Sequence, residues 1–165
     1  MKLDIGSQNA RFQDFTTVDM YAPEADVRAD ALKLPFPDNS IEDIWASHIL
    51  EHFKPSQVQP ALKEWLRVLK PGARARIVIP DLDDACRAWL ERRVGAMGMI
   101  FGGFGEEAGQ THFFGWGPLE LRDELLIAGY NVLSVQTMKE TATHNLGGTY
   151  WHNMVNIFAE VRKPT

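Results

Sequence analysis

Acidic residues follow two short β-rich segments near the start of the chain. Asp19 comes after residues 15–18, and Asp30 comes after residues 25–29. In an open α/β sheet, ligands bind outside the carboxyl ends of the strands, and a carboxylate there can accept hydrogen bonds from both hydroxyls of a ribose. That chemistry suits NAD and S-adenosylmethionine (SAM) equally, so it indicates a nucleoside rather than a reaction. The alternative is that aspartate ends these segments because it favours turns.

A single glycine follows the first expected strand, Lys2–Ile5. Gly6 lets the backbone approach a ligand closely because it has no Cβ. A dinucleotide fingerprint needs three glycines at fixed spacing, and residues 4–9 contain only one. This segment therefore argues against pyrophosphate binding.

Two histidines flank a glutamate in the middle of the chain. The string His48-x-x-Glu51-His52 matches a zinc-hydrolase pattern, in which two histidines one helical turn apart hold the metal and the glutamate serves as base. A third ligand would have to come from elsewhere, such as Glu120 or Glu124. The pattern requires a helix, whereas this stretch joins a strand to a loop. We therefore expect no metal ligands and keep a zinc hydrolase as a rival interpretation.

The elements that position these residues follow a β–α–β order. The pattern predicts a buried strand over residues 41–46, an amphipathic helix from Ser56 to the stop at Pro71-Gly72, and a second buried strand around residues 77–79. The earlier strands are joined by connections too short for full crossover helices. We therefore expect the helices of the first half to be reduced.

The second half of the chain completes the expected sheet. A helix is predicted over residues 118–128, followed by two β-rich runs at residues 130–138 and 154–161. The connection between these runs is too short for a crossover helix, so they should pair antiparallel. The expected fold is a three-layer α/β, Rossmann-like sandwich in one domain, residues 1–165, with a seven-stranded, mostly parallel sheet and an antiparallel C-terminal pair.

Two loops are rich in groups that could contact a ligand. Residues 95–117 interleave glycines with aromatic side chains, which is typical of an insertion or lid over a site; the alternative is a loop that folds back into the core. Residues 141–152 combine histidine, asparagine, tyrosine and tryptophan. They could bind a polar acceptor such as a sugar, or form an exposed hairpin loop.

Composition limits the function classes. A chain of 165 residues, 45% hydrophobic and 24% charged, is ordinary for a globular domain. The net charge of −5 argues against a nucleic-acid surface, which needs a basic face. No apolar run approaches a membrane span, and residues 1–4 lack a signal-peptide core. Cys86 is the only cysteine, so no internal disulfide can form and a cytoplasmic setting is expected.

Several segments together carry a family resemblance. In chain order they are Leu3-Asp4-Ile5-Gly6, Val18-Asp19-Met20, residues 30–40, Ser47–His52, Arg67–Gly72, Phe101-Gly102-Gly103 with His112, and residues 121–129. In these segments the chain resembles small class I SAM-dependent methyltransferases of the type 11 domain group. Within that group it is most similar to the short predicted methyltransferases found beside glycan genes. The resemblance implies methyl transfer from SAM to a small-molecule or glycan acceptor.

The resemblance also implies roles for individual residues. The residues implied to bind the cofactor are Asp4, Gly6 and Ser7 near the methionine moiety, Asp19 and Met20 at the ribose, Asp30, Ala31 and Leu32 at the adenine, and Ser47 and His48 facing the sulfonium. If the acceptor must lose a proton, His52 and His112 are the candidate bases, because a near-neutral imidazole suits that task. The alternative for each histidine is a structural hydrogen bond.

The first motif differs from the family pattern. Ser7-Gln8 stands where the family usually carries a further glycine or a cysteine. This motivates a second hypothesis, a catalytically silent relative that binds a nucleoside or a partner chain. No helix precedes the first expected strand, so a second copy of the chain could close the site. A homodimer is therefore a further hypothesis.

Overall fold

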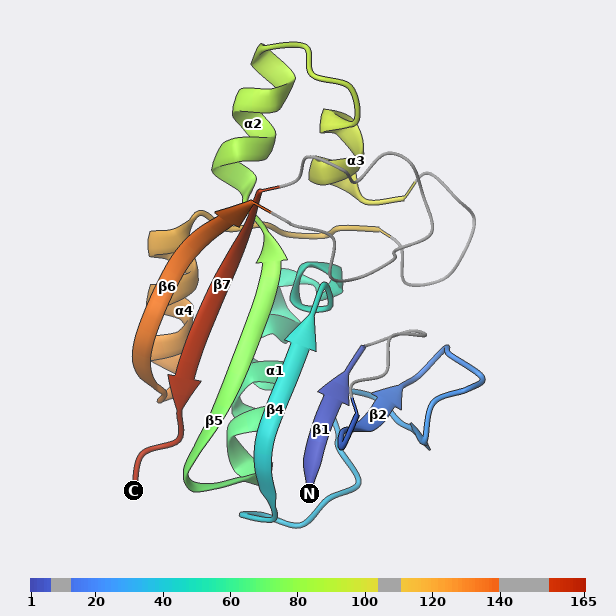
Figure 1. Ribbon diagram of the computed structural model, residues 1–165, viewed down its shortest axis with the longest axis vertical. Helices are drawn as coiled ribbons and strands as arrows, with labels where there is room; N and C mark the ends of the chain where they lie inside the picture. The colour runs from blue at the N-terminus through green and yellow to red at the C-terminus, as the bar shows by residue number, and fades with distance from the viewer. Residues whose placement is uncertain (7–12, 104–110, 140–154) are drawn as a thin grey trace.

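The computed structural model describes residues 1–6, 13–103, 111–139 and 155–165. Its centre is a seven-stranded sheet with the order β3-β2-β1-β4-β5-β7-β6 (Figure 1). The strands are β1 (Lys2–Ile5), β2 (Thr16–Asp19), β3 (Val27–Arg28), β4 (Ile41–Ser47), β5 (Leu69–Pro80), β6 (Asn131–Lys139) and β7 (Val155–Arg162). The helices are η1 (Leu50–His52, a 3₁₀ turn), α1 (Pro55–Val68), α2 (Leu82–Leu90), α3 (Ala96–Phe101) and α4 (Pro118–Ala128).

The strand directions confirm the expected fold. Strands β1 to β5 pair in parallel, and β7 pairs antiparallel with both β5 and β6. Because β1 lies between β2 and β4, the strand order reverses beside β1. This is the topological switch point at which open α/β sheets bind their ligands.

Helices α1 and α4 lie side by side on one face of the sheet (Figure 1). The strands present alternate residues to these helices, as the pleat requires. The core between sheet and helices is closely filled by aliphatic side chains with Trp65 and Tyr130 among them. Between β1 and β4 the described residues contain no helix, in agreement with the predicted reduction.

The boundaries of the central β–α–β unit differ from those predicted. Helix α1 begins at Pro55 rather than Ser56, because a proline at the first position has no N–H to leave unbonded. The Gln57 side chain accepts the N–H of Lys54, 3.0 Å away. At the other end α1 stops at Val68, and the pair Pro71-Gly72 lies inside β5 instead of forming the helix stop.

The proline-rich segment that precedes β4 is fastened to α1. The Arg67 guanidinium donates to the carbonyl oxygens of Phe36, at 3.0 Å, and Leu34, at 3.2 Å. Glu64 bonds to Arg67 at 2.7 Å and also accepts the N–H of Leu34 at 2.8 Å. In addition, the buried Trp65 donates its indole N–H to the carbonyl oxygen of Ala31 at 3.0 Å. One helix face therefore fixes the backbone that leads into β4.

Asp4 on β1 is a buried carboxyl on the sheet face away from α1 and α4. It pairs with Thr17 on one side and Trp45 on the other, and only 1% of it is exposed. Burial raises the pKa of Asp4 to about 7, because the charged form is poorly solvated there. The residues that the structure describes offer no hydrogen bond to its Oδ2.

We expect Arg67→Ala to lower the free energy of unfolding by about 2 kcal/mol, since it leaves two partly buried carbonyl oxygens and Glu64 without their charged donor. Urea unfolding measures the change. Lys63→Ala, at an exposed position of the same helix, is the matched control and should stay within about 0.5 kcal/mol of the native protein. Equal midpoints for the two variants would contradict the anchoring role of Arg67.

The stability of the protein should depend on pH through Asp4. Because its pKa is raised to about 7 in the folded state from 3.8, the folded protein holds a proton that the unfolded chain has lost, and stability falls as pH rises between these values. Asp4→Asn removes this term. We expect the difference in the free energy of unfolding between this variant and the native protein to shift in favour of the variant by on the order of 2 kcal/mol from pH 4 to pH 7, and then to level off.

Urea unfolding without cofactor at a series of pH values measures this advantage. Asp123→Asn, at an exposed position of α4, serves as the control and should show no comparable trend. A pH-independent difference between Asp4→Asn and the native protein would refute the burial argument.

Candidate active site

The carboxyl ends of β1, β2 and β4 meet at one edge of the sheet. Gly6 follows β1 with φ +73°, and its N–H donates to the carbonyl oxygen of Val18 at 2.8 Å. A Cβ at Gly6 would lie 2.7–2.8 Å from the side chain of Ile49. Both the backbone angle and the contact therefore require glycine, and the turn after β1 touches the loop after β4.

Asp19 closes β2 with a tight turn. Its Oδ1 accepts the N–H groups of Tyr21, at 2.7 Å, and Ala22, at 2.9 Å. The turn-forming alternative for this residue is thus correct. The same hydrogen bonds hold the carboxylate at the switch point, next to the exposed Met20. Turn formation and ligand binding are compatible here because a carboxylate has several acceptor positions.

Residues 30–32 form the next turn along this edge. Asp30 Oδ1 accepts the N–H of Leu32 at 2.8 Å, and Ala31 is held by the indole of Trp65 described above. Trp65 is fully buried on α1. The backbone of this turn is therefore positioned by a helix that lies more than thirty residues away in the sequence.

His48 follows Ser47 at the end of β4 in a left-handed conformation, with φ +53°. Its N–H donates to the carbonyl oxygen of Val78 at 2.9 Å, so the chain leaves the sheet at this residue. Its side-chain Nδ1 lies 3.2 Å from Glu51 Oε1. The unusual backbone turns the imidazole toward the glutamate.

Glu51 is a charged residue at a buried position, with 1% of its side chain exposed. Burial alone would raise the pKa of Glu51, but the contact with His48 outweighs burial and lowers it. Glu51 is therefore an ionised carboxylate inside the protein. From the sequence, a role for Glu51 was predicted only in the rival zinc pattern; the available signal was a lone acid directly after the apolar pair Ile49-Leu50.

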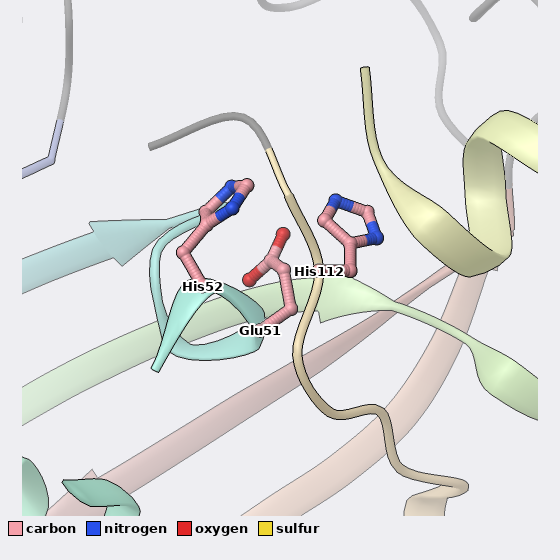
Figure 2. A group of neighbouring side chains, drawn as sticks. All are labelled: Glu51, His52 and His112. Atoms are coloured by element: carbon pink, nitrogen blue, oxygen red, sulfur yellow. The ribbon is translucent and has the colours of Figure 1, made fainter. Parts of the chain in front are cut away.

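His52 and His112 come together although sixty residues separate them. Figure 2 shows the Glu51 carboxylate between their rings. The ring centroids are 5.0 Å apart in an edge-to-face arrangement. Burial lowers the pKa of His112, against the opposing charge of Glu51, so this ring is held in its neutral form. The two predicted bases thus share one site.

A short segment carries His112 to this site. The Phe113 N–H donates to the backbone carbonyl oxygen of Glu51 at 2.8 Å, and the His112 N–H donates to that of Phe101 at 3.0 Å. Trp116 is buried, whereas Phe101, Phe113 and Phe114 remain exposed. Of the described aromatic side chains in the expected lid, one therefore enters the core and three line the surface near the histidines.

Other predicted features have different outcomes. The helical setting of the zinc-hydrolase pattern is absent, because His48 lies before η1 and η1 is only three residues long. Glu124, one of the two residues considered as a third zinc ligand, accepts hydrogen bonds from the side-chain amide of Gln59. Ser7, residues 104–110 and residues 141–152 lie outside the described residues, and their predicted roles stay predictions. The described helices include none long and apolar enough to cross a membrane.

Comparison with known proteins agrees with this geometry. Residues 4–77 match the family model of the methyltransferase domain. The search among curated proteins found no match. A SAM-dependent methyltransferase structure from Methanosarcina mazei has a TM-score of 0.70 at 19% identity, covering 99% of this chain and 92% of its own.

Two further structures are similar at lower identity. The Burkholderia thailandensis 1,6-didemethyltoxoflavin-N1-methyltransferase, solved with 1,6-didemethyltoxoflavin and S-adenosylhomocysteine, has a TM-score of 0.66 at 15% identity, with 99% of this chain and 71% of that chain covered. A putative methyltransferase from Haloferax volcanii, in complex with the Trm112 methyltransferase activator, also has a TM-score of 0.66 at 15% identity, with 99% and 82% covered.

At these identities the structural matches establish the fold. The family match adds the segment that contains Asp4, Gly6, Asp19 and His48. The expected resemblance is thereby confirmed. The family match over residues 4–77 and the fold make the chain similar to class I SAM-dependent methyltransferases, enzymes that use SAM as their cofactor.

Proposed function

We propose that the enzyme transfers the methyl group of SAM to a small-molecule or glycan acceptor bound over the cluster of Glu51, His52 and His112. The carrying observation is that the Gly6 turn, the Asp19 turn and this cluster lie along one edge of the sheet. The cofactor lies at the switch point between β1 and β4, and the acceptor lies on the η1 side of it.

The proposed cofactor contacts follow the order of the parts of an extended SAM molecule. The proposed contacts are Asp4, Gly6 and Ser7 for the methionine moiety, Asp19 and Met20 for the ribose, Asp30, Ala31 and Leu32 for the adenine, and Ser47 and His48 for the sulfonium. Support for these contacts comes from the hydrogen-bonded backbone at Gly6, Asp19 and Asp30, which requires little reorganisation to bind a ligand.

Methyl transfer is an in-line displacement at the sulfonium. A lone pair of the acceptor oxygen or nitrogen forms the new bond to the methyl carbon, and the bond from carbon to sulfur breaks, which leaves neutral S-adenosylhomocysteine. Positioning of the two reactants supplies much of the catalysis. The acceptor's proton passes to His52 or His112, whose ring nitrogens face the same site.

The proposed class of acceptor is inferred from the surface around the two histidines. Phe101, Phe113 and Phe114 are exposed there, and aromatic faces bind flat apolar molecules and the apolar faces of sugar rings. Residues 95–117 serve as the lid over this acceptor, and residues 141–152 supply polar contacts.

The same proposal includes the setting of the enzyme. The chain forms one methyltransferase domain, residues 1–165, and works in the cytoplasm, where its single, exposed cysteine, Cys86, stays reduced. Its substrates are not nucleic acids, given the net charge of −5. We also propose that the chain acts as a homodimer.

Gly6→Ala should abolish measurable SAM binding. The added Cβ would be strained at φ +73° and would meet Ile49, which moves the turn away from the cofactor. Gly98→Ala is the matched control, because a Cβ at Gly98 meets no atom within 4 Å. Calorimetric titration with SAM and S-adenosylhomocysteine should show binding to the native protein and the control only. Failure of the native protein to bind either compound would reject the proposal.

His52→Ala and His112→Ala should each lower methyl transfer by about 10²–10⁴-fold if the acceptor must lose a proton. Labelled SAM, offered with small-molecule and glycan fractions of a cell extract, identifies the product and measures the rate. SAM binding should be preserved in both variants, since neither residue is proposed to contact the cofactor. Unchanged rates in both variants would remove these histidines from the mechanism.

A further inference from the structure

Three potential metal ligands converge in the proposed acceptor site. One donor atom from each of Glu51, His52 and His112 lies within 4.8 Å of the other two, and Figure 2 shows the carboxylate between the two rings. They come from η1 and from the separate segment beside α3. The backbone hydrogen bond from Phe113 to Glu51 holds these two parts of the chain together.

The hydrogen bonds of the two rings select one nitrogen of each for binding. His52 Nδ1 lies 3.0 Å from the carbonyl oxygen of Thr111, and His112 Nδ1 lies 3.2 Å from that of Met99. A carbonyl oxygen only accepts, so Nδ1 carries the proton of each neutral ring and Nε2 carries the lone pair. Metal-binding histidines are usually oriented by such a bond to a backbone carbonyl.

The carboxylate between the rings lacks a complete set of partners. His48 Nδ1 approaches Glu51 Oε1 at 3.2 Å, while Oε2 is buried and makes no hydrogen bond with any residue that the structure describes. One donor atom of each half-buried ring therefore lies close to the buried carboxylate. A proton or a cation among these groups would stabilise them.

We infer that Glu51, His52 and His112 form a binding site for a divalent transition-metal ion such as Zn²⁺. Two imidazole nitrogens and one carboxylate oxygen are a known donor set for zinc with an open fourth position. Ligand atoms around a tetrahedral zinc lie about 3.4 Å apart, so these side chains must close by on the order of 1 Å. The expectation of no metal ligands is thereby revised.

This site differs from the rival zinc pattern in its ligands. His48 contacts Glu51 instead of the metal, Glu51 is a ligand instead of a base, and His112 comes from a distant segment. The role of the ion rests on the proposed function, although its binding does not. Metal coordination lowers the pKa of a bound hydroxyl, so an acceptor oxygen at the open position would be activated by the ion. With the ion bound, His52 and His112 would act as its ligands in place of their proposed role as bases.

Metal titration tests the inference. Tag-free protein is stripped with a chelator and titrated calorimetrically with Zn²⁺, and Co²⁺ binding is followed by its visible d–d absorption. We expect one ion per chain. Glu51→Gln and His112→Ala should each weaken Zn²⁺ binding at least about tenfold. Glu91→Gln, which removes an exposed carboxylate at the end of α2, should bind Zn²⁺ like the native protein.

Circular dichroism and SAM titration of each variant establish that it is folded. Absence of stoichiometric Zn²⁺ binding, or equal affinity in the native protein and both site variants, would overturn the inference. The parallel titrations separate it from the proposed function. SAM binding without Zn²⁺ binding rejects the metal site alone, whereas Zn²⁺ binding without SAM binding supports the site and rejects only the proposed function.

Discussion

A buried negative charge at Glu51 organises the proposed acceptor site. An ionised carboxylate that is almost fully enclosed is tolerated only when positive or hydrogen-bonding groups surround it. Here His48 approaches it from the end of β4, His52 follows it in η1, and His112 is brought in on a separate segment. The backbone carbonyl of Glu51 also holds that segment through Phe113. One residue thus connects the sheet, the 3₁₀ turn and the aromatic surface.

Helix α1 fixes the backbone on the side of the site that is proposed to bind the cofactor. Its face toward the sheet is apolar, but Glu64, Trp65 and Arg67 reach from it to the backbone of residues 31–36. These contacts replace the packing that helices between β1 and β4 would give in a larger domain. The protein can in this way keep fixed turns at this edge of the sheet although its described residues between β1 and β4 contain no helix.

The fold was predictable to a large extent because its signals are local. Buried strands such as Ile41–Ser47 and Val155–Arg162 show continuous or alternating apolar residues, and the short connections between early strands exclude long helices. Errors arose where two local signals compete. Pro71-Gly72 resembles a helix stop, yet β5 passes through it, since Gly72 adopts φ +75° and its N–H donates to the carbonyl oxygen of Lys163. That partner lies near the other end of the chain.

By itself, the sequence determined the order of the strands and of helices α1 and α4, the acidic turns at Asp19 and Asp30, and the close backbone approach at Gly6, because each depends on neighbouring residues or on backbone geometry. It also indicated His52 and His112 as candidate bases. It did not predict η1 or α3. Only the tertiary structure decided that these two rings enclose Glu51, and that His48 turns toward Glu51 at φ +53°. Contacts between residues sixty positions apart depend on how segments pack, and residue spacing along the chain carries no such information.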